Sequence, residues 1–135
     1  MTPVLVDSNV LVDVIAGDPR WGGWSSTALH ALAETSRLVI NPLIFAEVSV
    51  AFDSMEALEK VLPTTLYDRE PLPYDAAFLA GKVFDRYRKR GGLRRSPLPD
   101  FYIGAHAAVF GYRLLTRDVR RYRDYFPRLE LIAPS

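Results

Sequence analysis

Cysteine is absent from this 135-residue sequence, and histidine occurs only twice, at His30 and His106. The absence of cysteine excludes disulfide bonds, thiolate zinc sites and cysteine nucleophiles. A metal ion would therefore need oxygen or histidine ligands, and the 16 acidic residues suit a hard cation such as Mg²⁺ or Mn²⁺. The chemistry that this sequence offers is that of carboxylates.

Long apolar runs are also absent, since no stretch approaches the roughly 20 residues that span a bilayer. The N-terminal segment lacks a basic flank and reaches a carboxylate at Asp7, which is unlike a signal peptide. We therefore expect a cytoplasmic protein with no membrane partner. The length and the 49% hydrophobic content predict a single compact domain over residues 1–135.

The net charge is only +1, but the positive residues are unevenly distributed. Two stretches, at residues 86–95 and 113–128, hold six lysine or arginine residues each. Such runs are most often solvated helix faces. If the carboxylates form a phosphodiester site, however, these basic stretches and their tyrosines would suit a groove that follows a nucleic-acid backbone.

Short apolar runs separated by helical patterns predict the fold class. Strands are expected at residues 4–6, 38–40, 64–68, 113–116 and, at an edge of the sheet, 129–133. Their alternation with helices predicts an α/β fold with a mainly parallel central sheet of four to five strands, flanked by helices.

Capping residues predict where several helices begin and end. Asn9 is expected to cap the first helix, and Ser25 or Ser26 to begin the second. Asn41 followed by Pro42 is a favourable start for the third. Gly111 is expected to close a helix whose first turn carries an aspartate.

Four acidic residues occupy positions that parallel sheets bring together. Asp7 and Asp118 follow predicted strands, Asp100 begins a helix, and Glu47 lies in the first turns of another. Sites in open parallel sheets form at the carboxyl ends of the strands, so these side chains are expected to converge. Each could also be a turn, cap or surface residue, although Glu47 has apolar neighbours, among which an uncompensated charge costs several kcal/mol.

Four segments resemble, in order and spacing, the acidic motifs of PIN domains. They are VDSNVLVD at 6–13, AEV at 46–48, PDFYIGAHA at 99–107 and LLTRD at 114–118. The resemblance spans nearly the whole chain and is greatest to the VapC toxins of toxin–antitoxin pairs. It implies a PIN-like domain acting as an endoribonuclease.

The resemblance also implies roles for individual residues. Asp7, Glu47, Asp100 and Asp118 would surround Mg²⁺ or Mn²⁺, and the polar supports would be Asn9 and Thr116. We expect hydrolysis of RNA to leave a 5′-phosphate and a 3′-hydroxyl group. The implied partners are an RNA substrate, a VapB-like antitoxin that covers the acidic cleft, and a second copy in a homodimer.

A non-catalytic PIN-like module that binds RNA or another partner is the alternative from a different functional class. A phosphatase with an aspartate nucleophile would need a second aspartate at the position of Asn9. A receiver domain would need a lysine late in the chain, beyond Lys89. Asp13 and Asp53 are expected at the surface or at helix ends, and His106 is expected to be packed rather than catalytic.

Overall fold

A computed structural model describes residues 2–135 and contains one five-stranded sheet with the strand order β3-β2-β1-β4-β5. Every paired strand in it is parallel to its neighbour. The strands are β1 (Val4–Val6), β2 (Leu38–Ile40), β3 (Tyr67–Arg69), β4 (Arg113–Leu115) and β5 (Leu131–Ile132). The predicted α/β fold with a parallel central sheet is confirmed.

The central strands are apolar because helices cover both faces of the sheet. All three residues of β1 and of β2 are buried. β1 pairs Val4 with Leu38 of β2 on one side and with Arg113 of β4 on the other. Continuous apolar runs of this kind are typical of parallel strands buried on two faces.

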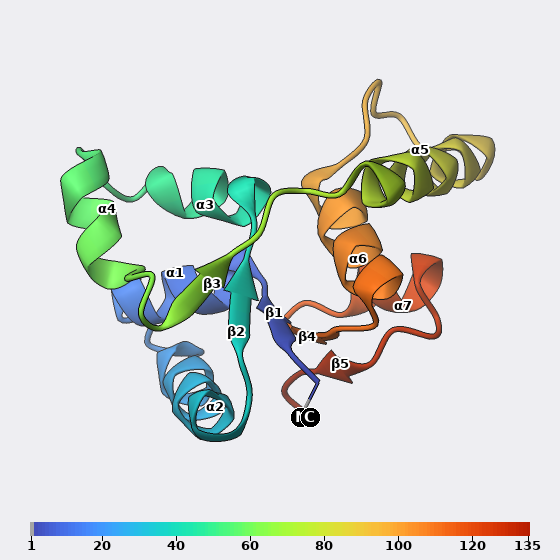
Figure 1. The fold of residues 1–135 in the computed structure, drawn as a ribbon. Coiled ribbons are helices and arrows are strands. Elements are labelled where there is room, and N and C mark those ends of the chain that lie inside the picture. Colours follow the sequence, from blue (N-terminus) through green and yellow to red (C-terminus); the bar gives the residue numbers. More distant parts are fainter. Residues whose placement is uncertain (1) are drawn as a thin grey trace.

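Helices surround the sheet, with α1 and α2 to its left in Figure 1 and α5, α6 and α7 to its right. The helices are α1 (Ser8–Ala16), α2 (Gly22–Thr35), α3 (Pro42–Ser49), α4 (Met55–Val61), α5 (Tyr74–Lys89), α6 (Pro99–Phe110) and α7 (Arg120–Tyr125). None of the described helices is long and apolar enough to cross a membrane.

Several element boundaries differ from those predicted, and two of the differences have a clear local cause. The second helix begins at Gly22 rather than at a serine, because the Asp18 carboxylate accepts hydrogen bonds from the backbone N–H groups of Arg20 and Trp21 and turns the chain early. The third strand begins at Tyr67 rather than at residue 64, because the chain before it forms a turn that bonds back to Pro63.

Two glycines set the position of the C-terminal elements. Gly111 ends α6 in the left-handed region, with φ of 69°, as its place after the helical pattern predicts. Within α6, a Cβ atom on Gly104 would lie 2.5 Å from the ring of Phe126. The bare glycine lets Phe126, at the end of α7, pack closely on α6.

Candidate active site

Asp7 lies directly after β1, and its side chain is almost wholly buried. Its Oδ1 atom accepts a hydrogen bond from the backbone N–H of Ser8 at 2.8 Å, so Asp7 is the N-cap of α1. Burial and the nearby charge of Asp100 raise the pKa of Asp7 to about 6. A buried carboxylate with a raised pKa at the end of a parallel strand is a typical feature of a functional site.

Thr116 and Asn9, the expected polar supports, both contact the other carboxylate oxygen of Asp7. The Thr116 hydroxyl donates to Oδ2 at 2.9 Å, and the Asn9 amide nitrogen lies 3.4 Å from the same atom. The Asn9 amide also donates to Thr116 Oγ1 at 3.2 Å. The prediction that Asn9 caps α1 is wrong, because Asp7 takes that place and Asn9 lies inside the helix.

Tyr122 on α7 contacts two of the predicted acids, a role that the sequence analysis did not assign to it. Its side chain is buried, and its hydroxyl oxygen lies 2.9 Å from Asp7 Oδ2 and 3.5 Å from Asp100 Oδ1. Burial and the charges of Asp7 and Asp100 raise the pKa of Tyr122 well above its usual value, so the phenol keeps its proton. Only its position in a short helix just after Asp118 could have pointed to it.

Asp100, in the first turn of α6, and Asp118, after β4, line a pocket of about 330 Å³ together with Arg120 and Arg121. Arg121 lies 3.7 Å from Asp100, and Arg120 lies 3.8 Å from Asp118. Burial raises the pKa of Asp100 against the opposing effect of Arg121, and the charge of Asp118 raises it further. The two acids therefore share one polar pocket.

Glu47 reaches the same region from the second turn of α3. Its Oε1 atom accepts a hydrogen bond from the Ser8 hydroxyl at 2.9 Å, directly beside Asp7. Burial raises the pKa of Glu47, the bond from Ser8 opposes the rise, and the charge of Asp100 adds to it. All four predicted acids thus lie at one edge of the sheet, linked through Ser8, Thr116 and Tyr122.

The chemistry of this cluster fits a hard cation, because every available ligand atom is an oxygen. Two neighbouring carboxylates also raise the pKa of Asp7, as like charges do when no cation lies between them. The side chains are nevertheless not arranged around a common centre. Within residues 2–135, no group of three or more Asp, Glu or His side chains is placed to hold one metal ion. Asp118 is 56% exposed, so packing does not fix its carboxylate in its present position.

Asp13 was expected at the surface or at a helix end, and it lies in the last turn of α1 but is buried rather than exposed. Its Oδ2 atom lies 2.7 Å from Nε of Arg117 and accepts a hydrogen bond from the Ser25 hydroxyl at 3.1 Å. The backbone N–H of Arg117 donates to Asn9 Oδ1 at 3.3 Å. This ion pair holds the loop between Thr116 and Asp118 against α1. It therefore helps to fix the position of that part of the carboxylate cluster.

His106 is fully buried, as expected, and belongs to a second polar network. Asn41 caps α3 through its carbonyl oxygen, so its amide nitrogen donates to His106 Nδ1 at 3.0 Å. The other ring nitrogen, Nε2, therefore carries the proton and donates to Glu70 at 3.1 Å. Glu70 also accepts a hydrogen bond from Tyr112 at 2.8 Å.

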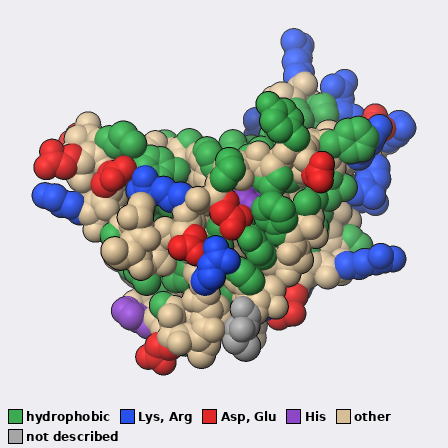
Figure 2. All heavy atoms as spheres, in the orientation of Figure 1, with side chains coloured by type: hydrophobic (Ala, Val, Ile, Leu, Met, Phe, Trp, Pro, Cys, Tyr) green, Lys and Arg blue, Asp and Glu red, His purple; other side chains and the backbone are tan. Residues whose placement is uncertain are grey.

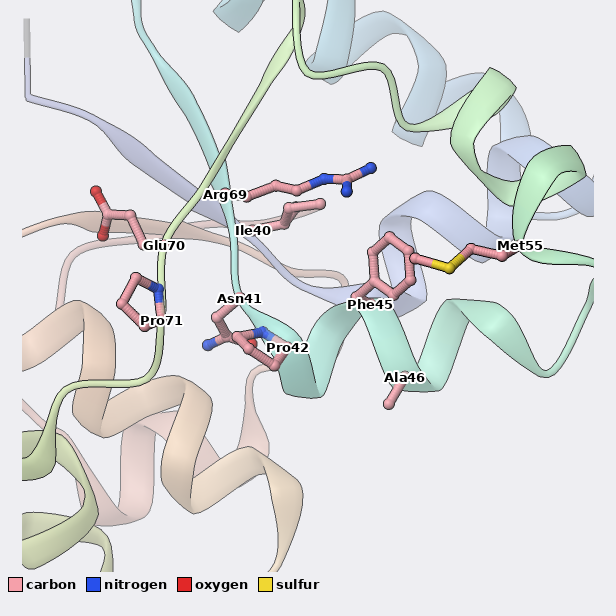
Figure 3. Close-up of a pocket in the computed structure, with 9 residues that line it drawn as sticks. All are labelled: Ile40, Asn41, Pro42, Phe45, Ala46, Met55, Arg69, Glu70 and Pro71. Carbon is pink, nitrogen blue, oxygen red and sulfur yellow. The ribbon is translucent and has the colours of Figure 1, made fainter.

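Figure 3 shows an apolar pocket beside this network, with Asn41 and Glu70 at one side and Phe45 and Met55 at the other. Its volume is about 360 Å³. None of the four predicted acids lines it. The carboxylate cluster and this pocket are therefore separate features of the molecule.

Comparison with known proteins assigns the sequence to a family. The sequence model of the PIN domain matches residues 4–126, which is most of the chain. Among curated proteins, no sequence similar to the chain was found.

Many solved structures share the fold, including the following three. VapBC2 from Rickettsia felis, bound to a DNA fragment from its promoter, gives a TM-score of 0.74 at 18% identity over 98% of both chains. VapBC-1 from nontypeable Haemophilus influenzae gives 0.72 at 16% identity over 96% of both chains. FitAcB from Neisseria gonorrhoeae has a TM-score of 0.70, at 16% identity over 96% of both chains.

Proposed function

The chain belongs to the PIN domain family, and we propose that it is a metal-dependent endoribonuclease, the toxin of a VapBC-type toxin–antitoxin pair. The single observation that carries the proposal is the pairing of Asp7 and Asp100 across the Tyr122 hydroxyl. Two carboxylates held this close repel each other, and a divalent cation would relieve that repulsion.

Asp7, Glu47, Asp100 and Asp118 would hold the cation. A bound Mg²⁺ or Mn²⁺ would polarise a phosphate oxygen and acidify a water molecule, which favours hydrolysis at neutral pH. Binding needs Asp7 in its ionised form, and its pKa of about 6 allows that form at neutral pH. Because Asp118 is exposed, its carboxylate is free to turn towards the other three.

The remaining residues of the site would orient these ligands and the substrate. Thr116 and Tyr122 both donate to Asp7 Oδ2 and so fix the orientation of its carboxylate. Arg120 and Arg121 line the same pocket as two of the acids, where their guanidinium groups could bind phosphate oxygens of the RNA.

A VapB-like antitoxin is the proposed protein partner. The solved VapBC structure from Rickettsia felis supports it, since that fold covers 98% of this chain. We further propose a homodimer, for which the exposed Tyr74, with 93% of its surface accessible, offers apolar contact area. Light scattering of the chain alone would give twice the mass of one copy.

The proposed activity is tested by incubating RNA with the wild-type chain in Mn²⁺ and in EDTA. Asp100→Asn removes one charge from the cluster, and Asp53→Asn removes one from an exposed position elsewhere. We expect cleavage by the wild type and by Asp53→Asn in Mn²⁺ only. Asp100→Asn should lose more than about 100-fold, because even partners outside the metal ligands are typically worth 10- to 100-fold.

Equal cleavage by the wild type and Asp100→Asn would remove the carboxylate site from the mechanism. Cleavage by neither protein with any candidate RNA would favour the non-catalytic binding module. Sequencing the cut ends adds an independent check, because hydrolysis by this route leaves a 5′-phosphate and a 3′-hydroxyl group.

A further inference from the structure

The C-terminal end of α5 and the loop that follows it form a strongly basic segment. Residues 86–99 contain six positive side chains and no negative one, although the whole chain carries a net charge of only +1. The six are Arg86, Arg88, Lys89, Arg90, Arg94 and Arg95. Figure 2 shows Lys and Arg side chains gathered at the end of the molecule where α5 lies in Figure 1.

Contacts with Tyr125 join this segment to α7. The guanidinium group of Arg90 lies over the Tyr125 ring, 5.0 Å from its centroid. Arg86 donates to the backbone carbonyl of Tyr125 at 3.4 Å. Since α7 itself adds three arginines, the two elements form one basic surface, which consists of Arg86, Arg88, Lys89, Arg90, Arg94, Arg95, Arg120, Arg121 and Arg123.

The basic surface begins at the carboxylate cluster. Arg121 lies 3.7 Å from Asp100 and remains 46% exposed, and Arg120 is 89% exposed beside Asp118. The loop after α5 leads directly into the first turn of α6, which carries Asp100. An RNA strand bound at the carboxylates would therefore lie against positive side chains immediately beyond them.

Several of these cations are not neutralised within the chain. Arg94, Arg95 and Arg123 are exposed and form no ion pair among residues 2–135, whereas Lys89 is paired with Asp85 at 2.9 Å. Arg90 is stacked on an aromatic ring, which holds the plane of its guanidinium group while its N–H groups stay available. Unpaired, partly fixed guanidinium groups are well suited to bind phosphate.

We propose that this basic surface binds the phosphate backbone of the RNA substrate, which runs from the carboxylate pocket across α7 and onto the end of α5 and its following loop. The inference rests on the proposed function, which makes RNA the substrate. An acidic peptide would also be attracted here. RNA is the better fit because the surface is continuous with the pocket that its scissile phosphate must enter.

The test measures binding without cleavage. A fluorescein-labelled 20-nucleotide oligouridine is titrated with the full chain in EDTA, and fluorescence anisotropy gives the Kd at several salt concentrations. The variant Arg94→Gln/Arg95→Gln removes two exposed charges from the surface. We expect it to bind about tenfold more weakly at low salt, with a salt dependence lower by about 0.7 in logarithmic slope for each lost phosphate contact.

The matched control is Lys60→Glu, which lowers the net charge by the same two units on α4, a helix that lies far from α5 and α7 in Figure 1. This control should keep the wild-type Kd within about twofold, as expected if local rather than net charge governs binding. Thermal unfolding of all three proteins checks that each is folded.

Equal affinities of the wild type and Arg94→Gln/Arg95→Gln would overturn the proposal, as would an equal loss in the control variant. A polyglutamate peptide that bound as tightly as the RNA, with the same loss in the variant, would also overturn it in favour of a peptide surface. EDTA removes divalent cations, so binding is measured without cleavage. A folded chain that binds RNA through these arginines in EDTA but cleaves no RNA in Mn²⁺ would refute the nuclease proposal and leave the RNA-binding proposal intact.

Discussion

The hydroxyl group of Tyr122 donates to Asp7 Oδ2 at 2.9 Å while lying 3.5 Å from Asp100. A phenol has one proton, so it satisfies only one of these carboxylates at a time. It stabilises Asp7 in its charged form, and while it does so Asp100 receives no proton from it. Tyr122 is therefore a positioning residue between two acids that come from β1 and α6.

Replacement of Tyr122 by Phe should raise the pKa of Asp7 above its present value of about 6, because the hydrogen bond from Tyr122 lowers that pKa. The acid limb of the pH profile for RNA cleavage should move to higher pH. The loss of one bond to a buried charged group should cost about 1–3 kcal/mol of stability near pH 8. NMR titration of the Asp7 carboxyl carbon would follow the pKa directly.

Tyr125→Phe is the matched control, since Tyr125 lies on the same helix and its hydroxyl group forms no hydrogen bond within residues 2–135. It should leave both the Asp7 titration and the pH profile unchanged. An unaltered titration in Tyr122→Phe would show that the hydroxyl group does not act on Asp7.

Asp7 should make the metal-free protein less stable as the pH rises. The folded-state pKa of about 6 lies above the usual value of about 4 in an unfolded chain. The folded state therefore binds the proton more tightly, and its stabilising effect is complete below pH 4 and lost as the pH rises through 6. Ionisation of such a buried carboxylate costs roughly 3 kcal/mol.

Asp7→Asn should accordingly gain stability relative to the wild type as the pH is raised from 4 to 8 in EDTA, by at most roughly 3 kcal/mol. Urea denaturation at several pH values measures the difference. Asp53→Asn, at an exposed position, should show no such trend. A constant difference between Asp7→Asn and the wild type across this range would contradict the raised pKa.

The strand pattern and the positions of the acids could be predicted because they depend on short segments. Val4–Val6 and Leu38–Ile40 are apolar runs of the length of buried strands, and Asp7 directly follows the first of them. Parallel pairing then places the ends of these strands at one edge, whatever the details of the helices. Local sequence was sufficient for this part of the fold.

Interactions between distant segments could not be predicted in the same way. Tyr122 reaches Asp7 across 115 residues, and Arg117 reaches Asp13 across 104. Nothing in the residues around Tyr122 distinguishes it from Tyr125, because the difference lies in which face of a six-residue helix meets the sheet. The burial of Asp13 likewise depends on an arginine that only the folded chain supplies.

The ion pair of Arg117 with Asp13 should contribute strongly to stability, because Asp13 is only 3% exposed. Arg117→Met leaves the carboxylate buried with Ser25 as its remaining hydrogen-bond donor, and should cost about 3 kcal/mol. Asp13→Asn should cost less, because no charge is then left buried. Urea denaturation of both variants and of the double variant gives the coupling between the two residues.

Arg128→Met, at an exposed position with no ion pair among residues 2–135, serves as the control and should change stability by less than about 0.5 kcal/mol. If Arg117→Met proved as mild as this control, the buried pair would not hold the loop before Asp118 in place.

His106 should affect stability with the opposite pH dependence to that of Asp7. Burial lowers the pKa of His106 below its usual 6.5, although Glu70 opposes the shift. The unfolded chain therefore takes up a proton first as the pH falls, so the stabilising effect of neutral His106 is present above about pH 6.5 and lost below it. A proton on Nδ1 would also face the amide donor of Asn41, which caps α3.

His106→Gln should keep a donor to Glu70 but remove this titration. We expect it to cost about 1–2 kcal/mol at pH 7.5, where a buried contact is lost, and progressively less as the pH falls to 5. The exposed His30 allows a matched control, His30→Gln, whose difference from the wild type should stay flat over the same range. If the His106→Gln difference were also flat, proton uptake by the unfolded chain at this position would not govern the acid stability of the fold.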